Sequence, residues 1–293
     1  MKDKTHIFCF HRISDEYSPA YPPIPVKVFD NICRHISRKY VVIPLDALHE
    51  KPLKTKTRAI ITFDDAYYDF YENAMPILSK HKMPAVQHVI TTCAETGESF
   101  WTQQLNKIVE GYHQTKTPIV LPELALNLNV RTARETERAA LSIYKQLLPL
   151  PERMVYLKQL AQKLDNPLKQ TKMMQWPEII DSQKHGICFG SHTHSHANLT
   201  TLTEADLDYE LKHSASLIKK QLAPQAVFPL AFPNGMYDLN VLQTAKNAGY
   251  DVMFSTESKA YSFELFPVLP RFSLYHQQWW KNYLRLLLTH KKH

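Results

Sequence analysis

The chain has 293 residues, 44% of them hydrophobic and 22% charged, which is the composition of a globular protein and excludes a disordered one. No run approaches the roughly 20 consecutive apolar residues that a membrane-spanning helix needs, so we expect no such helix. The formal net charge is +7, but lysines and arginines are spread along the chain without a dense basic block. We therefore expect no nucleic-acid partner.

Strand-forming and helix-forming segments alternate along most of the chain. Apolar strands are expected at 6–10, 41–43, 58–63, 85–90, 187–190, 226–232, 251–255 and 267–272. Helices are expected at 25–40, in the stretch that runs up to His81, from Thr203 onward with Asp206 as part of a capping-box variant, and at 239–250. Because such alternation implies parallel pairing, this many units predict an α/β fold, a closed or nearly closed β/α barrel.

The section from about 98 to 185 breaks this rhythm, since its pattern is largely helical. No Gly/Ser-rich linker or internal repeat marks a domain boundary on either side. We therefore interpret residues 1–293 as a single barrel domain that carries a helical insertion.

The N-terminal segment MKDKTHIFCFHRI has a basic tip, but its apolar stretch before His11 is too short for a secretory signal. The four cysteines show no C-x-x-C spacing and are interpreted as reduced thiols. Both observations favour a cytoplasmic protein. The segment 277–293 mixes tryptophan, leucine and basic residues as an interfacial helix would, so peripheral contact with the inner membrane stays open beside the favoured packing against the barrel.

Two adjacent carboxylates, Asp64 and Asp65, follow the expected strand 58–63 directly. Such a pair repels, and burying either charge without a partner is expensive. The loop after strand 187–190 contains His192 and His196, four residues apart, so that one helical turn would bring both imidazoles to one side. A solvated polar loop is the alternative interpretation of this histidine run.

The acid pair and the histidine run each follow the C-terminal end of a strand. In a β/α barrel these ends lie on one rim, which is where active sites are found, so we expect both groups at the same rim. Two neutral imidazoles and one carboxylate make a three-ligand metal site that leaves positions open for water and substrate. The second carboxylate would then stay beside the metal as a general base. This division of roles explains why the chain places two acids side by side.

The motifs TFDD (62–65) and SHTHSH (191–196) resemble those of the polysaccharide deacetylases of carbohydrate esterase family 4, which share the NodB homology domain. The resemblance covers roughly 5–95 and 186–275 and leaves the helical insertion outside. It implies a deformed (β/α) barrel and a divalent-metal hydrolase that removes N-acetyl groups from a sugar or polysaccharide. The implied substrate is therefore an N-acetylated carbohydrate.

Matched motif by motif, the resemblance implies that Asp64 is the catalytic base and that the metal ligands are Asp65, His192 and His196. His194 falls on a variable position within the motif and is not counted as a ligand. Zinc is the expected metal, while cobalt, nickel or iron could fill the same site.

Three further segments resemble motifs of the same family. LAFPNG (230–235) resembles the motif whose backbone N–H helps to hold the oxyanion, and this N–H would belong to Asn234. LPRF (269–272) resembles a late motif in which an arginine, here Arg271, orients the catalytic aspartate. FCFHRI (8–13) resembles a first-strand motif of a branch whose members act on extracellular or surface glycans.

Departures from the family pattern keep two rival functions open. Ala66 stands where the family usually has glycine, Ala197 where it has proline, and Ala231 where many members have arginine. One rival is a related C–N hydrolase that acts on a small amide. The other is a catalytically impaired glycan-binding protein.

The general acid that protonates the leaving amine has four candidates, His11, His88, His194 and His290. We favour His11, because it directly follows the first strand and therefore lies at the rim. His88 lies inside its strand, where a packed role is the simpler interpretation. His290 is expected on a terminal helix.

Overall fold

The computed structural model describes residues 5–50, 57–150, 152–164, 170–256 and 268–289. These residues form two compact units, and each is described here by itself. The larger unit comprises residues up to 15, 24–97 and 173 onward, and the smaller comprises 16–23 and 98–172. No helix among the described residues combines the length and the apolar character needed to cross a bilayer.

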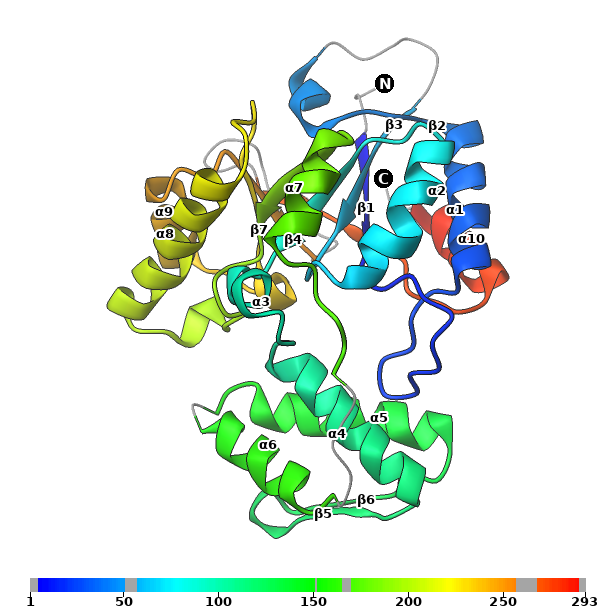
Figure 1. The fold of residues 1–293 in the computed structure, drawn as a ribbon, viewed down its shortest axis with the longest axis vertical. Helices are drawn as coiled ribbons and strands as arrows, with labels where there is room; N and C mark the ends of the chain where they lie inside the picture. The colour runs from blue at the N-terminus through cyan, green and yellow to red at the C-terminus, as the bar shows by residue number, and fades with distance from the viewer. Residues whose placement is uncertain (1–4, 51–56, 151, 165–169, 257–267, 290–293) are drawn as a thin grey trace. The chain divides into compact units, whose positions relative to one another are not determined.

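The larger unit is built on a parallel sheet (Figure 1). The strands pair in the order β10-β9-β8-β7-β4-β3-β1-β11, and β2 pairs with β3. In chain order they are β1 (Thr5–Phe10), β2 (Tyr40–Val42), β3 (Thr57–Phe63), β4 (Ala85–Val89), β7 (Ile187–Ser191), β8 (Pro229–Ala231), β9 (Val252–Ser255), β10 (Val268–Pro270) and β11 (Phe272–Ser273).

The two ends of this sheet meet through one short segment. Strand β10 pairs with β9, whereas β11 pairs with β1, and only Arg271 separates β10 from β11. The sheet is therefore a nearly closed parallel barrel, which confirms the expected deformed (β/α) barrel. Arg271 occupies the point where the barrel closes.

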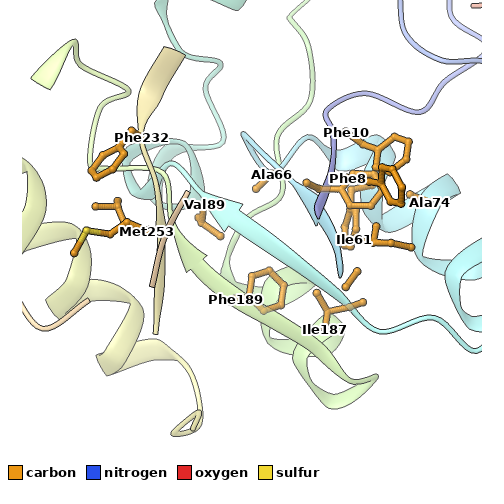
Figure 2. Packing of buried hydrophobic residues seen from close by; sticks show 14 of the residues in the cluster. Phe8, Phe10, Ile61, Ala66, Ala74, Val89, Ile187, Phe189, Phe232 and Met253 are labelled. Carbon is orange, nitrogen blue, oxygen red and sulfur yellow. The ribbon is translucent and has the colours of Figure 1, made fainter. Parts of the chain in front are cut away.

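Alternating residues of the strands build two cores. Ile7, Ile60 and Val86 belong to one buried cluster, while their neighbours Phe8 and Ile61 belong to another that also contains helix residues. The larger cluster is the one drawn in Figure 2. The period of two is what a strand buried on both faces produces when one face meets helices and the other the barrel interior.

The helices of the larger unit follow the strands as the sequence pattern indicates. Helix α1 buries Phe29, Ile32 and Ile36 at helical spacing. At the start of α8, Thr203 Oγ1 accepts a hydrogen bond from the backbone N–H of Asp206 at 3.2 Å. The helical elements are α1 (Val26–Lys39), η1 (Leu45–His49), η2 (Phe70–Ala74), α2 (Met75–Lys80), α3 (Thr91–Thr96), α7 (Trp176–Lys184), η4 (Leu199–Thr201), α8 (Glu204–Gln221), η5 (Pro233–Gly235), α9 (Leu239–Asn247) and α10 (Trp279–Thr289).

The C-terminal helix α10 contacts α1. The imidazole of His35 makes edge-to-face contacts with the rings of Trp279 and Tyr283, with centroids 5.8 and 5.2 Å apart. The next residue, Trp280, is 57% exposed. The helix is therefore partly packed against the barrel unit.

The smaller unit has its own apolar core, which includes Leu105, Ile143 and Leu160. A complete capping box starts α5, because Thr132 and Glu135 exchange side-chain and backbone hydrogen bonds. The elements of this unit are α4 (Trp101–Thr115), β5 (Ile119–Leu121), η3 (Pro122–Leu124), β6 (Leu126–Leu128), α5 (Ala133–Leu147) and α6 (Arg153–Gln162).

The bounds of this unit differ from those of the expected insertion at about 98–185. Helix α7 lies in the larger unit, packed beside β7, and residues 16–23 join the smaller one. The helical pattern of α7 resembles that of the segment before it, so periodicity alone could not separate the two. The antiparallel pair β5–β6 also interrupts the expected helical series.

Candidate active site

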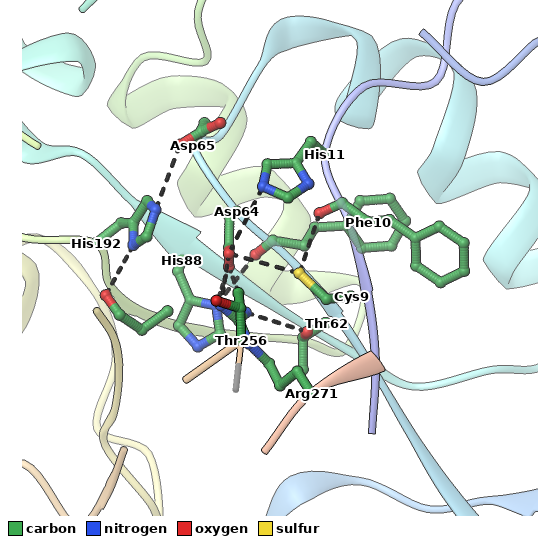
Figure 3. Close-up of polar contacts among 12 residues, drawn as sticks. Cys9, Phe10, His11, Thr62, Asp64, Asp65, His88, His192, Thr256 and Arg271 are labelled. Atoms are coloured by element: carbon green, nitrogen blue, oxygen red, sulfur yellow. Dashed lines mark hydrogen bonds and ion pairs between the residues drawn. The ribbon is translucent and has the colours of Figure 1, made fainter. Parts of the chain in front are cut away.

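The C-terminal ends of neighbouring strands gather the polar residues of the candidate site (Figure 3). His11 follows β1, Asp64 and Asp65 follow β3, and His192 follows β7. The register places these ends together, since Phe10 pairs with Phe63 and the backbone N–H of Asp64 donates to Phe10 O at 3.1 Å. The parallel barrel thus brings residues far apart in the sequence to one rim.

Asp65, His192 and His196 form a cluster whose ligand atoms all lie within 4.8 Å of one another. Asp65 Oδ1 is 3.4 Å from His192 Nε2 and 3.7 Å from His196 Nε2. His192 Nδ1 donates to the carbonyl oxygen of Ala231 at 2.7 Å, which fixes the tautomer and turns Nε2 toward Asp65. All three side chains are buried.

This cluster fits a divalent cation. Asp65 Oδ1 is buried and has no hydrogen-bond partner within the described ranges, which is costly for a carboxylate oxygen. Nitrogen and oxygen ligands about 2.0–2.2 Å from one ion stand at separations comparable to the 3.4 and 3.7 Å observed here. The donor set can therefore hold a metal ion, and the pairing of two imidazoles with one carboxylate is typical of open catalytic sites.

The protonation states agree with that assignment of donors. Burial lowers the pKa of His192 to about 4, and burial together with His192 lowers the pKa of His196 well below its ordinary value. Both imidazoles are therefore neutral near pH 7, as metal ligands must be. Burial and the neighbouring Asp64 raise the pKa of Asp65 well above its ordinary value, and a bound cation would reverse this shift.

Asp64 lies in a different environment from its neighbour. Arg271 donates from Nη1 to Oδ1 and from Nη2 to Oδ2, each at 2.7 Å, and the Cys9 thiol lies 3.6 Å from Oδ2. Burial alone would raise the pKa of Asp64, but Arg271, His192 and His88 hold it well below its ordinary value. Asp64 is thus bound by a cationic side chain, whereas Asp65 faces two neutral imidazoles.

His88, whose place inside a strand predicts a packed role, is a member of this network. Its Nδ1 donates to Asp64 Oδ1 at 2.9 Å, while Nε2 is buried without a hydrogen-bond partner in the described part of the chain. The pairing of Phe63 with Gln87 places His88 next to Asp64 on adjacent strands. Only the pairing register of β3 and β4 would have indicated that His88 contacts Asp64.

His11 lies on the solvent side of the same network. Its Nε2 is 3.9 Å from Asp64 Oδ2, and its side chain is 27% exposed, whereas the Asp64 side chain is 2% exposed. Burial lowers the pKa of His11 below its ordinary value despite the neighbouring Asp64. His11 is thus close to the carboxylate and partly exposed.

The other candidate residues lie in different places. The ring of His194 turns to Thr91 and His213 and takes no part in the Asp65 cluster. Asn234 lies in η5, directly after β8. His290 lies outside the described residues.

The loops that carry the site hold several non-glycine residues at positive φ, which is uncommon and costs backbone strain. Asp65 and Ala66 have φ of 71° and 55°, His196 has 58°, and Asn234 has 59°. Ala66 therefore adopts the left-handed conformation that ordinarily favours glycine. The strained backbone positions thus coincide with the candidate site residues and their neighbours.

The sequence from 51 to 117 and from 158 to 253 matches the family model of the polysaccharide deacetylases, over more than half of the chain. The chain belongs to the polysaccharide deacetylase family. This finding confirms the family indicated by the TFDD and SHTHSH motifs. No curated protein matches the chain significantly.

Solved structures with a similar fold align over nearly the whole length of this chain. The Streptococcus pyogenes deacetylase PplD, solved in complex with acetate, has 19% identity and a TM-score of 0.64, with 96% of each chain covered. IcaB from Ammonifex degensii has 15% identity and a TM-score of 0.60, with 94% of each chain covered. The BpsB deacetylase domain from Bordetella bronchiseptica has 15% identity and a TM-score of 0.53, with 92% of this chain and 95% of that one covered. At these identities the likeness concerns the fold.

Proposed function

We propose that this polysaccharide deacetylase family member is a metal-dependent hydrolase that removes N-acetyl groups from a sugar or polysaccharide. The proposal rests on one observation about the two adjacent buried acids. Asp65 faces the imidazoles of His192 and His196, whereas Asp64 is bound by Arg271 through both carboxylate oxygens. Such a division supplies both a ligand and a base at one rim. Family membership supports the choice of an acetylated carbohydrate as substrate.

Asp65, His192 and His196 would hold the metal, with zinc first among the candidates and cobalt, nickel or iron as alternatives. When bound, the ion supplies Lewis-acid polarisation of the acetyl carbonyl and a water that ionises near neutral pH. The hydrogen bond from His192 to Ala231 O keeps that imidazole in the tautomer that binds through Nε2.

Asp64 acts as the general base in this proposal. Arg271 keeps its carboxylate ionised despite burial, so that it can accept the proton of the attacking water. A positioned base of this kind typically contributes about 10²–10⁴ in rate. Arg271 and His88 position Asp64, because together they bind both carboxylate oxygens and so fix the plane of the group.

His11 protonates the leaving amine in this proposal. Its place beside Asp64, with a partly exposed side chain, puts an imidazole where a substrate amide can reach it. The backbone N–H of Asn234, in the turn after β8, is the proposed additional donor to the oxyanion.

A direct test is to incubate the zinc-loaded protein with N-acetylated oligosaccharides of different sugars and linkages and to measure newly formed amines. A matched set of small N-acetyl amides without a sugar addresses the rival C–N hydrolase. We expect amines from at least one oligosaccharide class and none above background from the small amides. Turnover confined to the small amides would overturn the proposal, as would glycan binding without any amine formation.

A further inference from the structure

His194 stands between the two proposed ligands of the SHTHSH loop, yet its side chain belongs to another cluster. Its ring turns toward α3 and α8, where Glu95, His194 and His213 offer ligand atoms that all lie within 4.8 Å of one another. We propose that these three residues form a second divalent-metal site, separate from the site of Asp65, His192 and His196. All three lie in the larger unit.

The main chain of His194 is fixed on both sides. Its N–H donates to Glu210 Oε2 at 2.9 Å, and its carbonyl oxygen accepts from Thr92 N at 2.9 Å and Thr92 Oγ1 at 2.7 Å. The ring is fixed as well, because Nδ1 bonds to Thr91 Oγ1 at 2.9 Å. Since metal-binding imidazoles usually donate through one nitrogen and bind through the other, this bond leaves Nε2 as the ligand atom.

His213 is held in place by an aromatic neighbour. Its ring stacks on that of Tyr209, with centroids 4.8 Å apart and an interplanar angle of 12°. Its side chain is half-buried on α8, facing His194. Little side-chain freedom therefore has to be lost when the imidazole binds an ion.

The imidazole pairs of the two sites, His192–His196 and His194–His213, have nearly the same mutual arrangement. The rings of His194 and His213 have centroids 4.7 Å apart at an interplanar angle of 85°. The rings of His192 and His196, the proposed ligands of the first site, have centroids 4.9 Å apart at 73°. A carboxylate completes each set: buried Asp65 in the first and exposed Glu95 in the second.

The position of this second site indicates its role. An ion bound there would connect α3, the SHTHSH loop and α8 through one residue each. Because His194 lies two residues from His192 and two from His196, the ion would hold in place the loop that carries both. Imidazole ligands favour zinc, copper, nickel or iron over magnesium or calcium.

The test uses metal-stripped full-length protein titrated with Zn²⁺, with calorimetry for affinity and elemental analysis for the bound ions per chain. The wild type should bind two ions, and His213→Ala should bind one. His185→Ala is the matched control, since it removes an exposed imidazole outside the cluster and should leave two. Thr91→Val keeps the side-chain shape and should weaken the second site by about 10–100-fold.

A wild type that binds a single ion and loses it in His192→Ala, or a His213→Ala variant that still binds two, would overturn the second site. Circular dichroism of His213→Ala should match the wild type, because the residue lies on the surface of a helix. His192→Ala separates this inference from the proposed function, since it should lose the first ion and keep the second. Retention of only the Asp65 site in the wild type would leave the deacetylase proposal untouched.

Discussion

Arg271 binds both carboxylate oxygens of Asp64, at 2.7 Å each, from the single position that separates β10 from β11. The same residue therefore completes the barrel and holds the proposed base. Its backbone N–H also donates to Ser255 O at 3.0 Å, which ties the closing segment to the end of β9. The residue at which the barrel closes therefore also holds the side chain of Asp64.

Replacement of Arg271 should affect stability and turnover together. Arg271→Ala leaves a buried carboxylate without its cation, so we expect the free energy of unfolding to fall by about 3–5 kcal/mol. Arg271→Lys keeps the charge but loses the two-pronged contact, so it should fold better and still turn over more slowly. Denaturant unfolding and steady-state kinetics of both variants provide the check. Wild-type stability in Arg271→Ala would show that the ion pair does not support closure.

The pH dependence of Arg271→Lys offers a separate reading of the same pair. Asp64 must be ionised to act as a base, so activity is lost as pH falls through its pKa. In the wild type Arg271, with the imidazoles, holds that pKa well below its ordinary value against burial, and Asp64 should set no limb in the accessible range. A weaker cation lets burial raise the pKa, so the acid limb of kcat/KM should move to higher pH.

The proposed ligands can be tested by metal content. In a His213→Ala background, where only the first site counts, His192→Ala or His196→Ala should bind no Zn²⁺ and keep the circular dichroism of the parent. His194→Ala, which changes a histidine of the same loop, should retain the ion at Asp65, His192 and His196. Full occupancy in either ligand variant would contradict the assignment.

His11 should set the alkaline limb of the pH–rate profile. A general acid must be protonated, so activity is present below its pKa and lost as pH rises through it. Because burial lowers the pKa of His11, this limb should lie at lower pH than for a free imidazole. His11→Ala should lower turnover, leave metal content unchanged and remove the limb. An unchanged limb in this variant would assign the acid to another group.

His88 should act on turnover and not on substrate binding. His88→Ala removes the bond to Asp64 Oδ1 and should reduce kcat by about 10–100-fold with KM unchanged. His88→Asn can place an amide N–H near the position of Nδ1, so it should recover part of the loss. A purely structural role would instead lower the melting temperature of both variants with no difference in kcat between them.

The sequence was sufficient for the barrel, because strand and helix patterns alternate along 5–95 and 186–273 with a clear period. It also placed Asp64 and His192 on one rim, since both follow strands directly. It could not reveal the contact of His88 with Asp64, because an apolar strand does not show which neighbour its polar residue faces. The smaller unit ends at residue 172, before the expected end of the insertion, for a related reason: α7 has the same period as the helices before it but packs in the larger unit.

The assignment of roles to individual site residues rests on the resemblance to the family and not on periodicity. The pattern indicated a metal site with one acid as ligand and one as base, without saying which acid has which role. In the structure Asp65 faces two imidazoles, whereas Asp64 faces Arg271 and His88. This asymmetry arises from long-range register, which local sequence does not encode.

The decisive measurement is acetate release from an N-acetylated oligosaccharide by metal-stripped wild type, zinc-restored wild type and zinc-loaded Asp64→Asn. We expect release only after zinc is restored, and a rate in Asp64→Asn reduced by about 10²–10⁴ although zinc remains bound. Release by the stripped protein at the restored rate, or a wild-type rate in Asp64→Asn, would contradict the division of the two adjacent acids into ligand and base.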